Sequence, residues 1–199
     1  MCKTTTLKRC LYILLLTGFI QSSLVHATLI ELQPSPLPAT TGDSISLNLV
    51  VSGLGMDSLG AFDISVGFDA SVLSFTSYSF GNYLGNINLF EAIDTSAGVA
   101  GGTVNVAEVS LLSALGLDAL QAGGFTLATL NFNVTNLALG AVTQLSVLSG
   151  PVLGDALGSP IAVTGLGSAS VGTIPIPGTL VLLTASMVGW LILKRCQSA

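Results

Sequence analysis

Basic side chains are absent from the whole middle of this 199-residue chain. Its lysine and arginine residues are confined to the two ends, at Lys3, Lys8, Arg9, Lys194 and Arg195, and its one histidine is His26. All ten carboxylates lie between these ends. Such a middle segment repels phosphate backbones, which excludes ordinary nucleic-acid binding, and it has no imidazole for histidine-based catalysis. Cations, neutral glycans and basic proteins stay open as partners.

Cysteine is missing from the same segment, because the three cysteines are Cys2, Cys10 and Cys196. Residues 28–172 therefore have to fold without disulfides, although an exported domain would meet conditions that permit them. About 145 residues are enough to bury most of their apolar surface as one domain. We expect three parts: residues 1–27, residues 28–172 and residues 173–199.

The first part has the order of a secretory signal peptide. Basic residues precede an apolar run from Leu11 to Ile20, and Val25-His26-Ala27 follows as a cleavage region. We expect cleavage between Ala27 and Thr28, with signal peptidase and the Sec export machinery as partners. An apolar run of about ten residues is short for a bilayer span, which disfavours an uncleaved anchor.

The last part has the pattern of a second targeting segment. Residues 174–193 are uncharged and largely apolar, and Lys194 and Arg195 follow directly. A stretch of about twenty residues can span a bilayer, and a basic pair after it stops transfer on the cytoplasmic side. The middle of the chain is then expected outside the cytoplasmic membrane.

This C-terminal arrangement begins with Pro175-Ile176-Pro177-Gly178. A Pro-Glu-Pro-like motif, an apolar segment and a basic tail resemble the PEP-CTERM sorting signal of Gram-negative bacteria, which an exosortase processes. Ile176 stands where glutamate is usual. The resemblance implies a precursor anchored in the inner membrane, followed by delivery to the cell surface or the extracellular matrix. A plain single-pass anchor is the alternative.

Strand periodicity dominates the middle. In residues 44–51 the side chains of Ile45, Leu47, Leu49 and Val51 share one face, and residues 61–69 alternate in the same way. Further strands are expected at residues 29–32, 72–80, 103–109, 125–134, 143–148, 161–163 and 169–171. Many short strands with one inward face each predict an all-β fold, a two-sheet antiparallel sandwich.

Two segments depart from simple alternation. The apolar phase shifts within residues 125–134, which predicts a bulge near Ala128 and Thr129. Residues 111–121 do not alternate, and Leu112, Leu115 and Leu120 are expected to line a short helix that covers a sheet edge.

The order of core and turn residues resembles that of cohesin-like domains across most of residues 29–172. The resemblance is carried by Gly42-Asp43, by Leu59-Gly60-Ala61-Phe62-Asp63-Ile64, by Phe68-Asp69-Ala70-Ser71-Val72-Leu73-Ser74-Phe75 and by residues 125–132. It implies a jelly-roll sandwich related to carbohydrate-binding modules. Cohesin-like domains bind dockerin modules in cellulosomes, with calcium on the dockerin side, and also occur as isolated surface modules.

Residues with site chemistry are few. Tyr78 and Tyr83 are the tyrosines that could serve as a sugar-stacking platform, although packing in the core or a turn competes with this role. Asp43, Asp57 and Asp69 fall in loops or at strand ends where calcium could bind, without a calcium-loop motif. Asp63 and Glu108 are interpreted as outward-facing strand carboxylates, the pair that a glycoside hydrolase would need.

The sequence therefore predicts a non-enzymatic, exported binding or structural protein with no cofactor of its own. Exopolysaccharide or a surface protein is the expected partner. A carbohydrate-binding module on a plain membrane anchor is the second hypothesis, and a glycoside hydrolase is the third.

Overall fold

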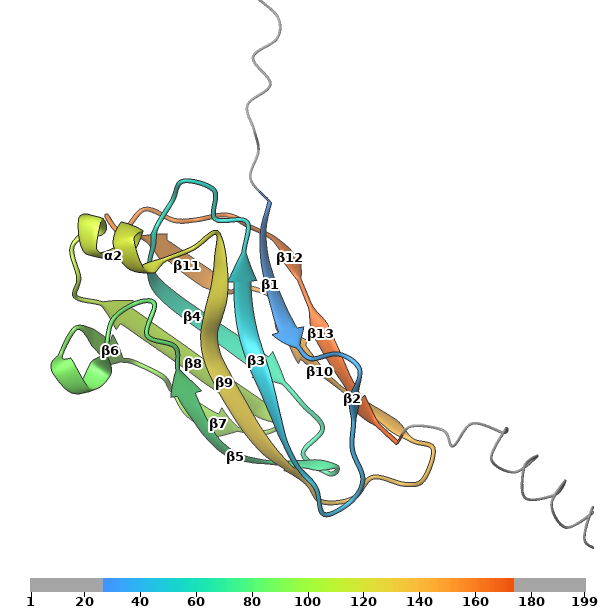
Figure 1. Cartoon of the computed structure of the whole chain (residues 1–199). Coiled ribbons are helices and arrows are strands. Elements are labelled where there is room, and N and C mark those ends of the chain that lie inside the picture. Colours follow the sequence, from blue (N-terminus) through green and yellow to red (C-terminus); the bar gives the residue numbers. More distant parts are fainter. Residues whose placement is uncertain (1–26, 174–199) are drawn as a thin grey trace, which may run out of the picture.

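The computed structural model describes residues 27–173, which form two facing β-sheets (Figure 1). This confirms the predicted two-sheet sandwich. The smaller sheet, called sheet A, has the strand order β12-β1-β3-β9-β5. Its strands are β1 (Thr28–Gln33), β3 (Ser44–Ser52), β5 (Leu73–Phe80), β9 (Gly124–Val134) and β12 (Val163–Leu166).

The larger sheet, called sheet B, has the order β2-β13-β10-β4-β8-β6, with β11 paired to β4 and β7 paired to β8. Its strands are β2 (Leu37–Pro38), β4 (Leu59–Gly67), β6 (Ala92–Asp94), β7 (Gly98–Ala100), β8 (Thr103–Ser110), β10 (Val142–Val147), β11 (Val152–Asp155) and β13 (Ser168–Gly172). Two short helices join strands, η1 (Ile87–Leu89) and α2 (Ala114–Leu120).

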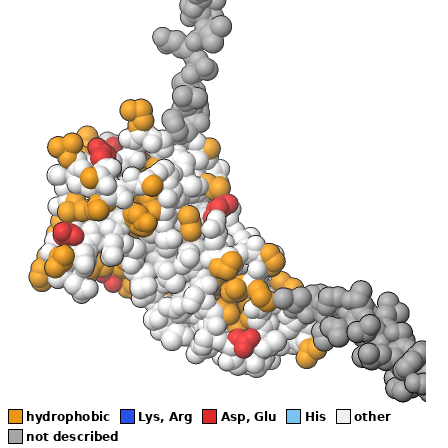
Figure 2. All heavy atoms as spheres, in the orientation of Figure 1, with side chains coloured by type: hydrophobic (Ala, Val, Ile, Leu, Met, Phe, Trp, Pro, Cys, Tyr) orange, Lys and Arg blue, Asp and Glu red, His pale blue; other side chains and the backbone are white. Residues whose placement is uncertain are grey.

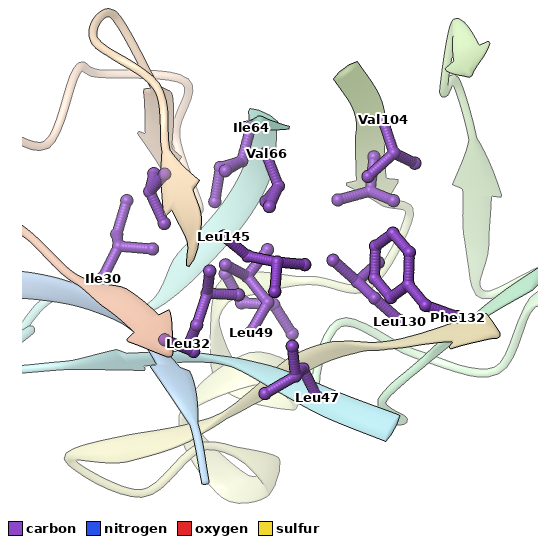
Figure 3. Packing of buried hydrophobic residues seen from close by; sticks show 14 of the residues in the cluster. Ile30, Leu32, Leu47, Leu49, Ile64, Val66, Val104, Leu130, Phe132 and Leu145 are labelled. Atoms are coloured by element: carbon purple, nitrogen blue, oxygen red, sulfur yellow. The ribbon is translucent and has the colours of Figure 1, made fainter. Parts of the chain in front are cut away.

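The core lies between the two sheets and is built from the inward members of the alternating strands (Figure 3). Leu47 and Leu49 of sheet A face Ile64 and Val66 of sheet B, and all four are fully buried. Phe132 of β9 is also fully buried and makes edge-to-face contacts with Phe68 and Phe75 at centroid distances of 5.1 and 5.5 Å. Aromatic pairs of this geometry add to the free energy gained from burial.

The predicted bulge in β9 is present and lies one residue earlier than expected. Leu49 pairs with Ala128 while Val50 pairs with Thr126, so Leu127 is the extra residue. Leu127 and Ala128 are consequently both buried. The bulge lets both apolar phases of β9 face the core.

Most pairings are antiparallel, but the sheets are mixed, because β12 pairs with β1 and β2 pairs with β13 in parallel. The cause is that both ends of the described chain change sheet without reversing direction. The first change occurs between β1 and β2, and the second occurs at Gly167 between β12 and β13.

Gly167 sits where the two sheets meet. Its N–H donates to Ile30 O of sheet A at 2.7 Å, and its carbonyl accepts from Val147 N of sheet B at 3.1 Å. A Cβ at this position would lie 2.9 Å from the Cα of Glu31. Glycine is therefore the residue that lets the chain cross between sheets here.

The predicted short helix is present, but the side chain that it buries is not one of those expected. In α2 the buried side chain is Leu117, while Leu115 is 82 % exposed and Leu120 is 46 % exposed. The prediction that Leu115 and Leu120 cover the sheet edge is wrong. A helix of seven residues makes barely two turns, so a single inward side chain is enough to fix it.

The described chain enters and leaves at opposite ends of the sandwich (Figure 1). Within residues 27–173 no helix has the length and hydropathy needed to cross a membrane. The predicted signal peptide before Ala27, the sorting motif Pro175 to Gly178 and the stop-transfer pair Lys194 and Arg195 lie outside the described residues, except that Ala27 and Thr28 begin them.

Candidate functional site

The outer face of sheet B exposes apolar side chains in register across three strands. Val109 of β8 pairs with Ala61 of β4 on one side and with Ile93 of β6 on the other. Val109 is 38 % exposed and Ile93 is 47 % exposed. Val152 of β11 follows in the next row, where it pairs with Asp63. We call these residues, Ala61, Asp63, Ile93, Val109 and Val152, the apolar face.

A polar pair borders the apolar face and is held rigidly. The Asn105 side-chain amide donates to Asp63 Oδ1 at 2.6 Å, and Asn105 Oδ1 accepts from Ala97 N at 2.9 Å. Asp63 is therefore oriented by β8, while its position on the sheet stays open to solvent. A partner with a hydroxyl or basic group could reach this carboxylate directly.

The loop that leads into β6 presents two large apolar side chains beside this face. Phe90 is 84 % exposed and has a positive φ of 57°, and the preceding Leu89 is 66 % exposed. Asn86 fixes the loop, because its side chain caps η1 through Asn88 N at 2.9 Å. Phe90 is the C-cap of η1 and donates its N–H to Ile87 O, so the left-handed conformation, although costly for a bulky residue, is the one that ends this helix.

Sheet A has an outer face of a different kind. Paired strands carry Ser and Thr opposite Asn, and these side chains bond to each other. Ser44 Oγ donates to Asn133 Oδ1 at 2.7 Å, and Ser46 Oγ donates to Asn131 Oδ1 at 2.6 Å. Thr129 Oγ1 donates to Asn48 Oδ1 at 2.9 Å. Much of the hydrogen-bonding capacity of this face is thus used within the sheet.

Charge is sparse and of one sign. The space-filling view shows isolated acidic groups and no basic group on the side where sheet A lies (Figure 2). All ten carboxylates of the chain fall within the described residues, whereas its lysines and arginines do not. Any charged partner of these faces is expected to be cationic.

Glu108 is not outward-facing, so the prediction for this residue is wrong. It follows Val104 and Val106 on the inner side of β8 and is fully buried, with no hydrogen-bond partner for either carboxylate oxygen among the described residues. Burial raises the pKa of Glu108 to about 8, and the nearby Asp94 carboxylate adds to the effect. Asp63 points outward, so the two carboxylates lie on opposite faces of sheet B and do not form a glycosidase pair.

The two tyrosines occupy different places. The Tyr78 ring packs against the core and edge-to-face on Phe80 at 5.2 Å, and its hydroxyl donates to Asp94 Oδ2 at 2.7 Å. Tyr83 is 39 % exposed and stacks on Phe125 at 4.8 Å. The structure does not join them into one surface through a shared contact, and their role as a ligand platform stays a prediction.

Two of the aspartates considered for calcium, Asp43 and Asp69, accept hydrogen bonds within local turns. Asp43 Oδ2 accepts from Thr40 N at 2.7 Å and from Thr40 Oγ1 at 2.9 Å, and these bonds hold the pKa of Asp43 below its usual value. Asp69 accepts from the Ser71 side chain and backbone, which lowers its pKa in the same way. Among residues 27–173 no three carboxylate, imidazole or thiol groups gather at one point.

The family follows from a match to the cohesin domain model over residues 35–171, so this chain belongs to the cohesin domain family. Cohesin domains are non-catalytic protein-interaction modules, so the domain is a binding module and not an enzyme. The expectation that the chain is not an enzyme is confirmed on this ground. No curated protein sequence matches the chain.

Solved structures agree with this fold. The sixth cohesin of Acetivibrio cellulolyticus scaffoldin B, solved with a Cel5 dockerin, is 19 % identical with a TM-score of 0.59, over 74 % of this chain and 99 % of that one. A non-cellulosomal cohesin from the archaeon Archaeoglobus fulgidus is 18 % identical with a TM-score of 0.55, over 74 % and 92 %. A cohesin module from a Clostridium perfringens family 33 glycoside hydrolase is 14 % identical with a TM-score of 0.54, over 74 % and 97 %.

Proposed function

We propose that this chain is an exported cohesin-type binding protein that takes a protein partner on the apolar face of sheet B. The observation that carries the proposal is the row Ala61, Val109 and Ile93, which exposes aliphatic side chains in register on three adjacent strands. Covering exposed aliphatic groups with a partner is favourable, because it removes apolar surface from water.

A dockerin-bearing protein is the partner that we propose first. Several solved relatives of this fold were crystallised with dockerins. Another surface protein is the alternative, and the acidic charge of this chain favours a partner with basic or hydroxyl groups around an apolar patch. Leu89 and Phe90 would add contacts at the edge of the same interface.

The test places one charge on each outer face of the full chain. Val109→Asp should lower the affinity for dockerin modules encoded in the same genome by at least about tenfold, because it puts an unpaired charge at the centre of the interface. Ser46→Asp on sheet A is the control and should leave the affinity unchanged. Isothermal titration calorimetry gives both affinities.

Equal affinity of the two variants would contradict the proposed binding face. Binding of glycans without binding of any dockerin or surface protein would contradict the proposed partner. Glycan binding that is lost in Tyr83→Ala or Tyr78→Ala would favour a carbohydrate-binding module instead. Circular dichroism of each variant checks that the sandwich is intact.

We further propose the domain division 1–27, 28–172 and 173–199, with signal cleavage before Thr28 and sorting through Pro175, Ile176, Pro177 and Gly178. The protein would be held in the inner membrane through residues 174–193, with Lys194 and Arg195 on the cytoplasmic side, and would then reach the cell surface or matrix of a Gram-negative bacterium. One supporting observation is that Thr28 begins strand β1 and is buried.

Mass spectrometry of the mature protein tests this route. The expected N-terminus is Thr28, and the C-terminal segment should be removed in cells that carry an exosortase and kept in a deletion strain. An intact C-terminus in both strains would leave the plain anchor and refute sorting by an exosortase.

A further inference from the structure

A narrow apolar groove lies where the described chain ends, on the outer side of sheet B. Pro36, Leu37 and Pro38 form one wall, Val142 of β10 forms the other, and the volume is about 360 Å³. Ser170 and Gly172 of β13 line it between these walls, and Thr173 lies at its end.

The groove is kept open by a residue without a side chain. A Cβ on Gly172 would lie 2.8 Å from Val142 Cγ2 and 2.9 Å from the carbonyl oxygen of Ala141. Val142 is 62 % exposed, so nothing among the described residues covers it. An apolar space of this size beside the exit can accept one or two aliphatic side chains.

The alternation of β13 indicates which side chain comes next. Ala169 and Val171 point inward and are fully buried, while Ser170 and Gly172 point to the groove. A strand repeats every two residues, so position 174 falls on the groove side if the backbone continues extended, two residues beyond the row in which Gly172 pairs with Val142 and Pro38. Pro175 favours this course, because the residue before a proline avoids the helical region.

The start of this course is fixed by two bonds. Ala39 N donates to Gly172 O at 3.0 Å, and Gly140 N donates to Thr173 Oγ1 at 2.8 Å. The chain therefore leaves the sandwich in a defined place next to Val142, and the first residue beyond it is an isoleucine. The following residues, Pro175, Ile176 and Pro177, are apolar and lack two of the three backbone donors that would need water.

We propose that the groove is a docking site for the chain's own segment Ile174–Pro177, with the Ile174 side chain reaching back diagonally to pack against Val142 and Pro38. The segment then lies on the domain instead of forming a free tether. Docking holds the domain in one orientation relative to the apolar segment that follows. This inference does not depend on which partner the apolar face binds.

A double-mutant cycle on the full chain in non-ionic detergent micelles tests the contact. Val142→Ser and Ile174→Ser are made singly and together, and urea unfolding gives the equilibrium constant of each variant. Val142→Ser should raise the unfolding constant about threefold to tenfold more in the parent chain than in the chain that already carries Ile174→Ser, because only the parent loses a buried aliphatic contact. Val152→Ser is a matched control, because Val152 is also a valine of sheet B with 62 % exposure. It should show no coupling to Ile174.

A second measurement follows the segment itself. Proteinase K should cut residues 174–178 about tenfold faster in Val142→Ser than in the parent or in Val152→Ser, since cleavage follows the population of the undocked segment. Equal cutting and no coupling would overturn the proposal. Coupling that depends on protein concentration would identify a second copy as the occupant. If Val142→Ser has no coupling but weakens binding to phosphatidylethanolamine and phosphatidylglycerol vesicles, the occupant is a lipid surface. Either result also overturns the proposal.

Discussion

The outer faces of sheets A and B cover the same core, yet they use their side chains in different ways. On sheet A, Ser46 and Asn131 bond to each other, and most neighbours do the same. On sheet B, Val109 and Ile93 lie side by side with nothing over them among the described residues. A polar face whose groups already bond to each other contributes little free energy of binding when a partner covers it. Exposed aliphatic groups contribute more, because covering them removes apolar surface from water.

Polarity alone is therefore a poor guide to a binding surface on this sandwich. Sheet A offers many more hydroxyl and amide groups, but they are committed within the sheet. Sheet B offers fewer polar groups, of which Asn105 and Asp63 are also bonded to each other, but it exposes aliphatic side chains such as Val109 and Ile93. Substitutions in the core or on one outer face at a time can separate the contribution of the shared core from that of each face.

The largest effect is expected from the core that both faces share. Phe132→Ala removes a fully buried ring with two aromatic neighbours and should lower the free energy of unfolding by about 3–5 kcal/mol. Urea denaturation followed by circular dichroism measures the change. Asn131→Ala, the next residue on the outer side, is the control and should cost far less. A small loss in Phe132→Ala would mean that the two sheets do not depend on a common core.

The next effect concerns the inner side of sheet B, directly beside Val109. Glu108 has a pKa of about 8 in the folded chain, against 4.5 ordinarily. The folded state therefore keeps its proton while the unfolded state loses it, so the stability falls as pH rises from about 4.5 to about 8 and then levels off. Glu108→Gln should remove this slope and raise stability at pH 8 by a few kcal/mol.

Thermal unfolding between pH 4 and pH 9 measures the Glu108 effect. Partner binding at the apolar face should be unchanged in Glu108→Gln, since the side chain points inward. A parent protein that is as stable at pH 8 as at pH 5 would show that Glu108 is not a buried neutral acid.

The smallest effect comes from a matched pair of asparagines, one on each outer face. Asn131 of sheet A contacts Ser46 and Ser77, and Asn105 of sheet B contacts Asp63 and the backbone of Ala97. Changing either to alanine should cost about 1 kcal/mol of stability. Only Asn105→Ala should also weaken partner binding, because it releases Asp63. Calorimetric titration with the dockerin panel distinguishes them, and equal binding losses would erase the proposed difference between the faces.

The long strands can be predicted from sequence because they repeat with a period of two. Ile45, Leu47, Leu49 and Val51 alternate without interruption, and all four are buried. The phase shift in residues 125–134 locates a bulge to within one residue. Edge strands β6, β7 and β11 escape prediction, because three or four residues are too few to establish a period.

The candidate face is harder to predict for a different reason. Val109 and Val106 are the same residue type in one strand, and only their parity separates an exposed side chain from a buried one. The same parity, read from Val104 and Val106, would have placed Glu108 inside. Which outward rows then line up across β4, β8 and β6 depends on register, and register between distant strands is set by tertiary packing.

The sheet change at Gly167 has a consequence for mechanical load. A pull on Thr173 runs along β13, which is bonded to β10 on one side and to β2 on the other. Such a force is parallel to the strand, so the ladder bonds resist together in shear instead of opening one after another. At the far end of β13, the backbone bonds of Gly167 pass part of the tension to Ile30 in the opposite sheet. A module tethered through its last strand would thus spread tension over both layers of the sandwich.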